Sequence, residues 1–207
     1  STESAGGSFP VTIDHAFGET TIEAQPERVV TVSWGNQEAA LALGVVPVAM
    51  PKVTWGDEDG DGLLPWVKDK LDELGAETPT LMDETDGFDY EAIADAQPDV
   101  ILGAYSGMTQ EQYDTLSKIA PVVAFPEVAW GTSWQEMTLT DAKALGREEQ
   151  AEELIADLEK HVTDASANYP ALAGKKTLFT YLDPTDLSTL GYYSTLDPRA
   201  AYLTELG

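Results

Sequence analysis

The chain has 207 residues, of which 11 are Lys or Arg and 37 are Asp or Glu, so its formal net charge at pH 7 is −26. This charge argues against nucleic acid or an anionic lipid surface as a partner, because both repel a strongly acidic protein. The sequence contains no cysteine, which excludes disulfides and thiolate metal sites. Its longest nearly apolar stretch, residues 39–50, includes glycine and proline and is shorter than the roughly 20 residues that cross a bilayer.

The N-terminal segment is predicted to be a tether followed by a hairpin. Residues 1–9 are mostly small and polar, a composition typical of a flexible tether. Residues 11–24 alternate in polarity around a turn at Gly18 and Glu19. This alternation predicts a two-stranded hairpin, which we expect at the edge of the main sheet.

Strands and short helices then alternate as far as residue 125. Runs typical of buried strands lie at residues 29–32, 45–50, 79–82, 100–104 and 122–125. Helices are predicted at residues 39–43, 64–74, 89–96 and 110–119, with Asn36 as a helix N-cap. This alternation predicts an α/β fold with a Rossmann-like N-terminal lobe, in which helices cover both faces of a parallel sheet.

The last third of the sequence predicts one long helix and part of a second lobe. Residues 147–169 contain neither glycine nor proline, and their apolar residues recur at helical spacing. Strands at residues 176–182 and 187–193 and a helix from Asp197 follow. These few elements cannot bury their own apolar faces, so the second α/β lobe is expected to be incomplete. The predicted domains are a tether (1–9), an N-terminal lobe (10–140), an interlobe helix (141–170) and the start of a C-terminal lobe (171–207).

Metal-binding and catalytic patterns are weak. The stretch "DEDGDG", residues 57–62, resembles a calcium loop, but Lys68 stands where a bidentate Glu is needed, which favours a solvated acidic loop. The two histidines lie in different predicted elements, His15 in the hairpin and His161 on the apolar stripe of the long helix, where we expect it to be partly buried. No nucleophile elbow, P-loop or zinc-protease motif occurs, so we expect no enzyme.

Aromatic residues follow the carboxyl ends of four predicted strands. In open α/β sheets, ligands bind in the crevice beyond these ends, where flat amphipathic rings provide contact area at low entropic cost. Core packing is an equal alternative for any one of these rings, but four together favour a binding crevice. The candidate ligand-binding residues are Trp34, Gly35, Asn36, Lys52, Trp55, Tyr105, Ser106, Trp130, Tyr192 and Tyr193.

Four segments, in order, carry a resemblance to a known family: "PERVVTVSWGNQEAALALGVVPVAM", "FDYEAIADAQPDVILG", "LSKIAPVV" and "ALGREEQAEELIADLEKHV". The chain resembles the iron-siderophore and vitamin B12 solute-binding proteins of bacterial ABC transporters from Val11 nearly to its end. The resemblance implies two α/β lobes joined by a rigid helix, with a shallow cleft for a ferric siderophore, haem or cobalamin and little hinge motion. It also implies an extracytoplasmic location, in the periplasm or at the cell surface as a lipoprotein that meets the membrane only through its lipid anchor.

Within this resemblance, the ligand is expected to be a ferric siderophore. Zinc and manganese carriers use His-rich sites, and neither histidine lies at the carboxyl end of a strand, as a haem ligand would. The sequence places none of the three arginines obviously in the cleft, and anionic catecholate or citrate complexes favour arginine clusters. We therefore favour a ferric hydroxamate, with iron bound only through the siderophore and no cofactor of the protein's own. A cobalamin or haem carrier and a ligand-free interaction module remain alternatives.

Glu91 is the expected docking residue for the transporter. From residue type alone it is a solvated helix residue. In the resemblance, Glu91 matches the family position whose carboxylate pairs with an arginine of the membrane permease. The expected partners are thus a ferric siderophore and an ABC transporter permease.

Overall fold

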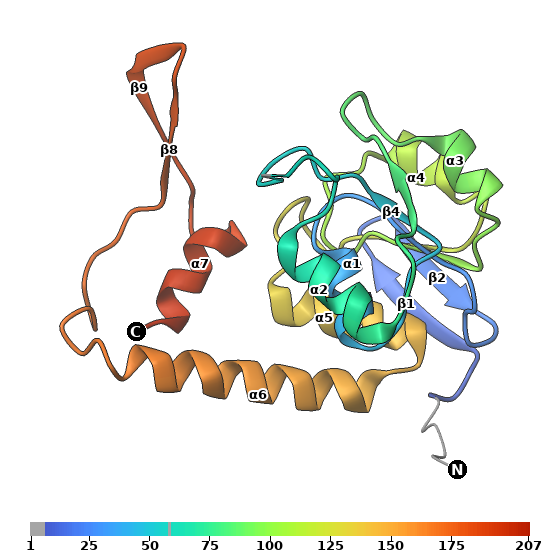
Figure 1. Ribbon diagram of the computed structural model, residues 1–207, viewed down its shortest axis with the longest axis horizontal. Coiled ribbons are helices and arrows are strands. Elements are labelled where there is room, and N and C mark those ends of the chain that lie inside the picture. Colours follow the sequence, from blue (N-terminus) through green and yellow to red (C-terminus); the bar gives the residue numbers. More distant parts are fainter. Residues whose placement is uncertain (1–6, 58) are drawn as a thin grey trace.

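A computed structural model describes residues 7–57 and 59–207 (Figure 1). Its centre is a five-stranded parallel sheet in the order β5-β4-β3-β6-β7. The strand order reverses between β3 and β6, which creates the type of switch point where α/β proteins open a crevice. The predicted parallel α/β lobe is confirmed. The strands are β3 (Val29–Thr31), β4 (Ala49–Pro51), β5 (Thr80–Met82), β6 (Val100–Leu102) and β7 (Val122–Val123).

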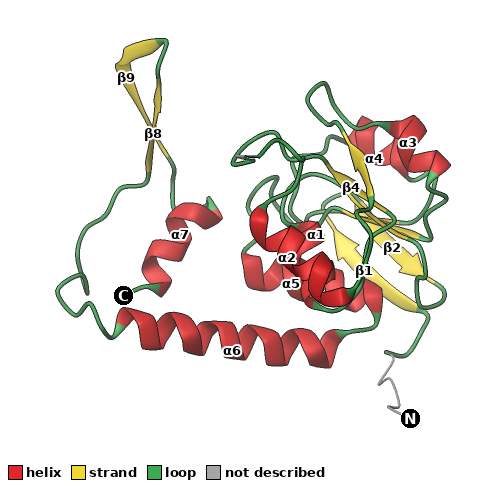
Figure 2. Ribbon diagram, viewed as in Figure 1, coloured by secondary structure: helices red, strands yellow, loops and turns green. Residues whose placement is uncertain are grey.

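Helices cover both faces of this sheet (Figure 2). Successive strand side chains point to opposite faces, so Val29 packs with Ala40 and Leu145 on one face, whereas Val30 packs with Ile93 on the other. All residues of β3, β4, β6 and β7 are buried, which explains their continuous apolar sequences, whereas the edge strand β5 is partly exposed. The helices are α1 (Asn36–Ala42), α2 (Pro65–Leu74), α3 (Tyr90–Asp95), α4 (Gln110–Leu116) and α5 (Trp134–Leu145).

The N-terminal hairpin differs from its predicted position. Strands β1 (Val11–His15) and β2 (Gly18–Ile22) form a separate antiparallel sheet, so the prediction of an edge position in the main sheet is wrong. The hairpin packs on the lobe through its buried apolar face, which includes Ile13 and Ile22, and its strands do not pair with strands of the main sheet. Of the segment predicted as a tether, residues 1–6 lie outside the described residues. The remainder contacts the lobe, where the Gly7 N–H donates to the Gly146 carbonyl oxygen at 3.1 Å.

Helix α5 was not predicted. The Ser133 hydroxyl accepts a hydrogen bond from the Glu136 N–H at its start, and Gly146 ends it with a left-handed φ of 65°. The boundary predicted at residue 141 therefore lies inside α5. Asn36 is also not the N-cap of α1, because Gly35 takes that position with a φ of 84°.

The predicted long helix is α6 (Glu148–Ser166), which runs along one side of the molecule (Figure 1). Its Ala151 and Ile155 are buried, but His161 is exposed, so the expectation of a partly buried His161 is wrong.

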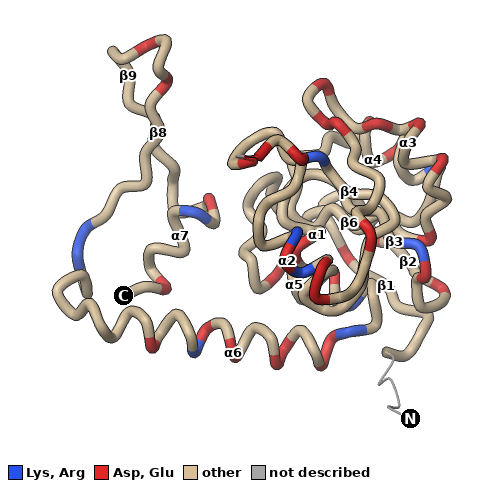
Figure 3. The backbone as a smooth tube through the Cα atoms, in the orientation of Figure 1, with Lys and Arg blue, Asp and Glu red and all other residues tan. Residues whose placement is uncertain are grey.

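The C-terminal elements are β8 (Thr180–Asp183), β9 (Asp186–Tyr192) and α7 (Pro198–Glu205). The β8–β9 hairpin projects away from the other elements, whereas α7 lies between α6 and the N-terminal lobe (Figure 1). Acidic residues occur in loops and helices along the whole chain (Figure 3). Within residues 7–57 and 59–207, every helix is too short or too polar to cross a membrane.

Candidate ligand-binding site

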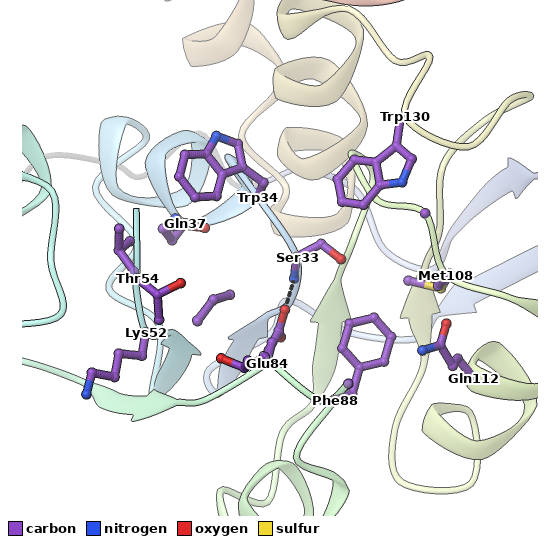
Figure 4. Close-up of a pocket in the computed structure, with 15 residues that line it drawn as sticks. Ser33, Trp34, Gln37, Lys52, Thr54, Glu84, Phe88, Met108, Gln112 and Trp130 are labelled. Carbon is purple, nitrogen blue, oxygen red and sulfur yellow. Dashed lines mark hydrogen bonds between the residues drawn. The ribbon is translucent and has the colours of Figure 1, made fainter. Parts of the chain in front are cut away.

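Two adjoining cavities lie beyond the carboxyl ends of the central strands. The larger, of about 840 Å³, lies between the N-terminal lobe and α7. The smaller, of about 330 Å³, is built by the N-terminal lobe alone (Figure 4). Trp34 and Trp130 line both cavities. The other residues of the larger cavity are Gly35, Trp55, Tyr105, Thr132, Trp134, Met137, Phe179, Asp197, Pro198, Arg199 and Tyr202.

Trp34 is held by an unusual turn between β3 and α1. Ser33 and Gly35, on either side of it, have left-handed φ values of 64° and 84°. A serine rarely adopts this conformation, so its surroundings must stabilise it. The Ser33 N–H donates to Oε2 of Glu84 at 2.9 Å, which holds the turn against the loop after β5. Trp34 is consequently 43% exposed at the mouth of both cavities.

Asn36 is fully buried and does not line either cavity. Its Nδ2 donates to the Val32 carbonyl oxygen at 2.8 Å and to the Tyr105 carbonyl oxygen at 3.1 Å. Its Oδ1 accepts from the Tyr105 N–H at 3.1 Å. This amide therefore joins the loops after β3 and β6. Asn36 was predicted to contact the ligand, but in the structure its side chain holds these two loops together.

Tyr105 and Trp130 form one wall of the larger cavity. Their rings meet edge to face with centroids 5.3 Å apart, and burial raises the pKa of the Tyr105 hydroxyl. The backbone N–H of Trp130 donates to the Ser106 carbonyl oxygen at 2.9 Å. The Trp130 indole lies so close to Gly107 that a Cβ at that position would overlap it. Ser106 itself is fully buried and lines neither cavity, which leaves Tyr105 and Trp130 as the exposed partners.

The structure brings an arginine into the larger cavity, which corrects the expectation that none lies there. Arg199 begins α7 and lines the wall opposite Trp34 and Tyr105. Its Nε and Nη2 donate to the two carboxylate oxygens of Asp197 at 2.8 and 2.7 Å. Its guanidinium lies 4.0 Å from the centroid of the Tyr193 ring. The bidentate pair adds no net charge to the wall.

The other sequence-predicted residues are dispersed. Lys52 lines the smaller cavity, and Trp55 contributes to the larger one although 83% of it is exposed. Tyr193 lines neither cavity but contacts Phe179, with ring centroids 5.5 Å apart. Tyr192 lies exposed on β9 and also lines neither cavity.

Sequence reasoning missed several lining residues. Trp134 and Met137 were missed because α5 was not predicted, and Phe179 because it belongs to a lobe predicted only in outline. Glu84 follows the carboxyl end of β5. The same criterion that identified the aromatic residues, a position just after a strand, would therefore also have identified Glu84. Burial raises the pKa of the Glu84 carboxyl to about 7, although the hydrogen bond from Ser33 opposes this shift.

The acidic loop and Glu91, the expected docking residue, lie outside both cavities. Carboxylate oxygens of Asp57, Asp59 and Asp61 lie within 4.8 Å of one another. The Lys68 ammonium is 2.9 Å from Asp61 and 3.9 Å from Asp59. Lys68 therefore supplies positive charge to this acidic loop. Glu91 is exposed in the first turn of α3, where a partner can reach it.

Comparison with known proteins gives a consistent set of relatives. A periplasmic binding protein family model matches residues 29–206. The probable siderophore-binding lipoprotein YfiY of Bacillus subtilis is 36% identical over 156 residues, which are 74% of this chain and 44% of that protein. The ferric enterobactin-binding periplasmic protein FepB of Escherichia coli O6:H1 is 30% identical over 168 residues, 76% of this chain and 49% of FepB. The chain thus spans about half the length of these curated relatives.

Solved structures share the fold over most of the chain. PiaA of Streptococcus pneumoniae TIGR4, in complex with ferrichrome, superposes with a TM-score of 0.90 and 46% sequence identity, covering 95% of this chain and 66% of PiaA. A periplasmic solute-binding protein of Mycobacterium smegmatis has a TM-score of 0.81 and 30% identity, covering 95% of this chain and 67% of that protein.

Proposed function

This chain belongs to the periplasmic binding protein family, and we propose that it captures a ferric siderophore outside the cytoplasmic membrane for delivery to an ABC importer. The named relatives support this proposal, because YfiY is described as siderophore-binding and PiaA holds ferrichrome. In this proposal the chain is a solute-binding protein and not an enzyme.

The observation that carries the proposal is the aromatic cavity between the N-terminal lobe and α7. Its volume of about 840 Å³ lies within the usual range for small-molecule sites. Indole and phenol rings give large contact areas, and their N–H and O–H groups can donate hydrogen bonds to ligand oxygens. Trp34, Tyr105 and Trp130 are the residues that we expect to make these contacts.

The paired charges of the wall favour a ferric hydroxamate over an anionic complex. Ferric catecholate and citrate complexes carry negative charge and need uncompensated arginines. Arg199 is compensated by Asp197, although its donors can still reach a ligand oxygen. The preference for a hydroxamate therefore rests on neutralisation of the arginine and not on its absence. Iron would reach the protein only inside the siderophore, without a cofactor of the protein's own.

Delivery would use the exposed face that carries Glu91. Its carboxylate at the start of α3 is free to pair with an arginine of a permease. The expected location is extracytoplasmic, since YfiY is described as a lipoprotein and FepB as periplasmic. Contact with the membrane would come through the permease and a lipid anchor.

The proposal is tested by calorimetric titration of the 207-residue chain with ferric trihydroxamate, ferric catecholate, ferric citrate, haem and cobalamin. We expect saturable binding of the ferric hydroxamate and none of its iron-free form. Trp130→Ala removes an aromatic anchor and should weaken binding on the order of tenfold or more. Trp66→Ala is the matched control, because Trp66 is exposed on α2 and lines neither cavity.

Two results would contradict the proposal. If the chain bound only haem or cobalamin, the ligand class would be wrong. If no compound bound, or if Trp66→Ala weakened binding as much as Trp130→Ala, the cavity would not be the site.

A further inference from the structure

Two residues that line the smaller cavity carry buried acceptor oxygens without a hydrogen-bond partner in the described chain. Oε1 of Glu84 and Oε1 of Gln37 are buried without a hydrogen-bond partner, and both residues line this cavity. The other Glu84 oxygen accepts from the Ser33 N–H, so only half of the carboxylate has a structural role (Figure 4). A buried unsatisfied acceptor costs free energy, and a ligand that donates hydrogen bonds removes this cost.

Aromatic side chains line the same cavity. Trp34 and Trp130 stand on one side of the cavity and Phe88 lies beside Glu84 (Figure 4). Aromatic faces attract cations, and a carboxylate among them strengthens the preference. A primary ammonium group combines a positive charge with three hydrogen-bond donors, which matches both the rings and the unpaired oxygens.

The charged residues around the cavity leave Glu84 without a counter-ion. Lys52 and Glu84 are the titratable residues among those that line it. The Lys52 side chain extends away from Glu84 (Figure 4), and its charge helps to lower the pKa of Asp83, after the larger effect of hydrogen bonds from Thr85. The raised pKa of Glu84, about 7, reflects burial without compensation by a cation.

We propose that the smaller cavity is a subsite for a primary ammonium group of the ligand, with Glu84 as its counter-ion. This inference rests on the proposed function and narrows its substrate class to ferric hydroxamates that carry a free primary amine. The iron complex occupies the larger cavity and the amine reaches past Trp34 and Trp130, which line both cavities.

The test compares a linear ferric trihydroxamate that ends in a primary amine with the same complex after acetylation of that amine. In the wild-type chain at pH 8, the amine complex should bind about tenfold tighter or more, because charge-assisted hydrogen bonds form only with the ammonium. Glu84→Gln removes the charge but keeps an oxygen that can accept from Ser33, so the affinity ratio should fall towards one. Asp86→Asn is the matched control, since it removes an exposed charge from the same loop outside the cavity and should leave the ratio unchanged.

The pH dependence gives an independent measurement on the wild-type chain. The ammonium requires ionised Glu84, so the affinity ratio should rise from pH 6 to pH 8 and level off above that range. Equal affinity of the two complexes in the wild-type chain, or equal loss of the ratio in Asp86→Asn, would overturn the inference.

A small amine separates failure of this inference from failure of the proposed function. 1-Aminopentane is titrated into the chain while the indole N–H signals of Trp34 and Trp130 are followed by NMR. Shifts that disappear in Glu84→Gln support the ammonium subsite even if no trihydroxamate binds. Absence of shifts in the wild-type chain would overturn the subsite even if both trihydroxamates bind.

Discussion

Single side chains in this protein often decide the geometry of whole loops. Asn36 joins the loops after β3 and β6 through three hydrogen bonds to the Val32 and Tyr105 backbone. Glu84 similarly holds the left-handed Ser33 that precedes Trp34. The positions of the exposed rings therefore depend on buried polar groups that do not themselves fill the larger cavity.

His15 is another buried polar group, and its hydrogen bonds define its protonation. Nδ1 accepts from the Phe17 N–H at 3.2 Å, so the proton resides on Nε2, which donates to the Thr20 hydroxyl at 2.9 Å. The Thr20 hydroxyl in turn donates to the Val122 carbonyl oxygen at 2.7 Å. Burial lowers the pKa of His15, although the nearby Asp14 charge opposes the shift.

This depressed pKa predicts a loss of stability in mild acid. The unfolded chain takes up a proton near pH 6.5, whereas the folded chain resists it until a lower pH. Unfolding free energy should therefore fall as the pH decreases below 6.5, by up to about 1.4 kcal/mol per pH unit until the folded-state pKa is reached. Urea unfolding between pH 7 and pH 5 measures this slope.

The second histidine provides the control. His15→Gln should remove this part of the slope, and His161→Gln should keep it because His161 is exposed on α6. Equal slopes in both variants would show that other groups cause the pH dependence.

At the scale of elements, the two ends of the chain differ in packing. The strands β3 and β6 are fully buried between helices, whereas β8 and β9 are almost entirely exposed. A two-stranded hairpin without a packed face is marginally stable. Besides its strand pairing, it is held by local contacts such as the Thr185 N–H donating to Oδ1 of Asp183 at 2.8 Å and the Tyr181 and Tyr193 rings, whose centroids are 5.5 Å apart.

This contrast predicts uneven hydrogen exchange. Backbone amides of β8 and β9 should exchange much faster than those of β3 and β6, because local opening of the hairpin exposes no buried core. Exchange followed by mass spectrometry on the 207-residue chain measures this difference. Protection of the hairpin equal to that of β3 would mean that another surface covers it in solution.

At the scale of the whole molecule, the net charge of −26 opposes the compact state. Acidic residues, 37 against 11 Lys and Arg, occur in loops and helices along the described chain, with basic residues scattered among them (Figure 3). Only a few acidic side chains are paired in the described residues, such as Asp61 with Lys68 and Asp197 with Arg199. Most of the carboxylates that repel one another are therefore exposed to solvent, where salt can screen their charges.

Screening predicts that salt stabilises the protein. The Debye length falls from about 30 Å at 0.01 M to about 3 Å at 1 M ionic strength. Raising sodium chloride from 0.01 to 0.5 M should increase the unfolding free energy by about 1 kcal/mol or more, which corresponds to roughly 2–4 °C in Tm for a chain of this size. Calorimetry measures the shift, and an unchanged or lower Tm would show that self-repulsion does not limit stability.

The sequence by itself determined the alternation of strands and helices, the parallel sheet, the long helix and the aromatic rings at strand ends. These features follow from local rules, since hydrophobic periodicity and strand direction are encoded in short segments. It did not reveal that β1 and β2 form a separate sheet, because the same alternation suits either position. It also missed α5, because the buried face of this helix includes the polar residues Thr138 and Asp141, which interrupt the apolar pattern.

Only the tertiary structure decided which side chains share a cavity. Arg199 lies more than 160 residues from Trp34, yet both line the larger cavity. Asn36 and Ser106 follow strands as Trp34 does, but side-chain direction buries them. Glu84 and Gln37 are candidates for a ligand only because they line one cavity and each carries a buried, unpaired oxygen. Such convergence depends on how loops and lobes pack in space, which local sequence patterns do not specify.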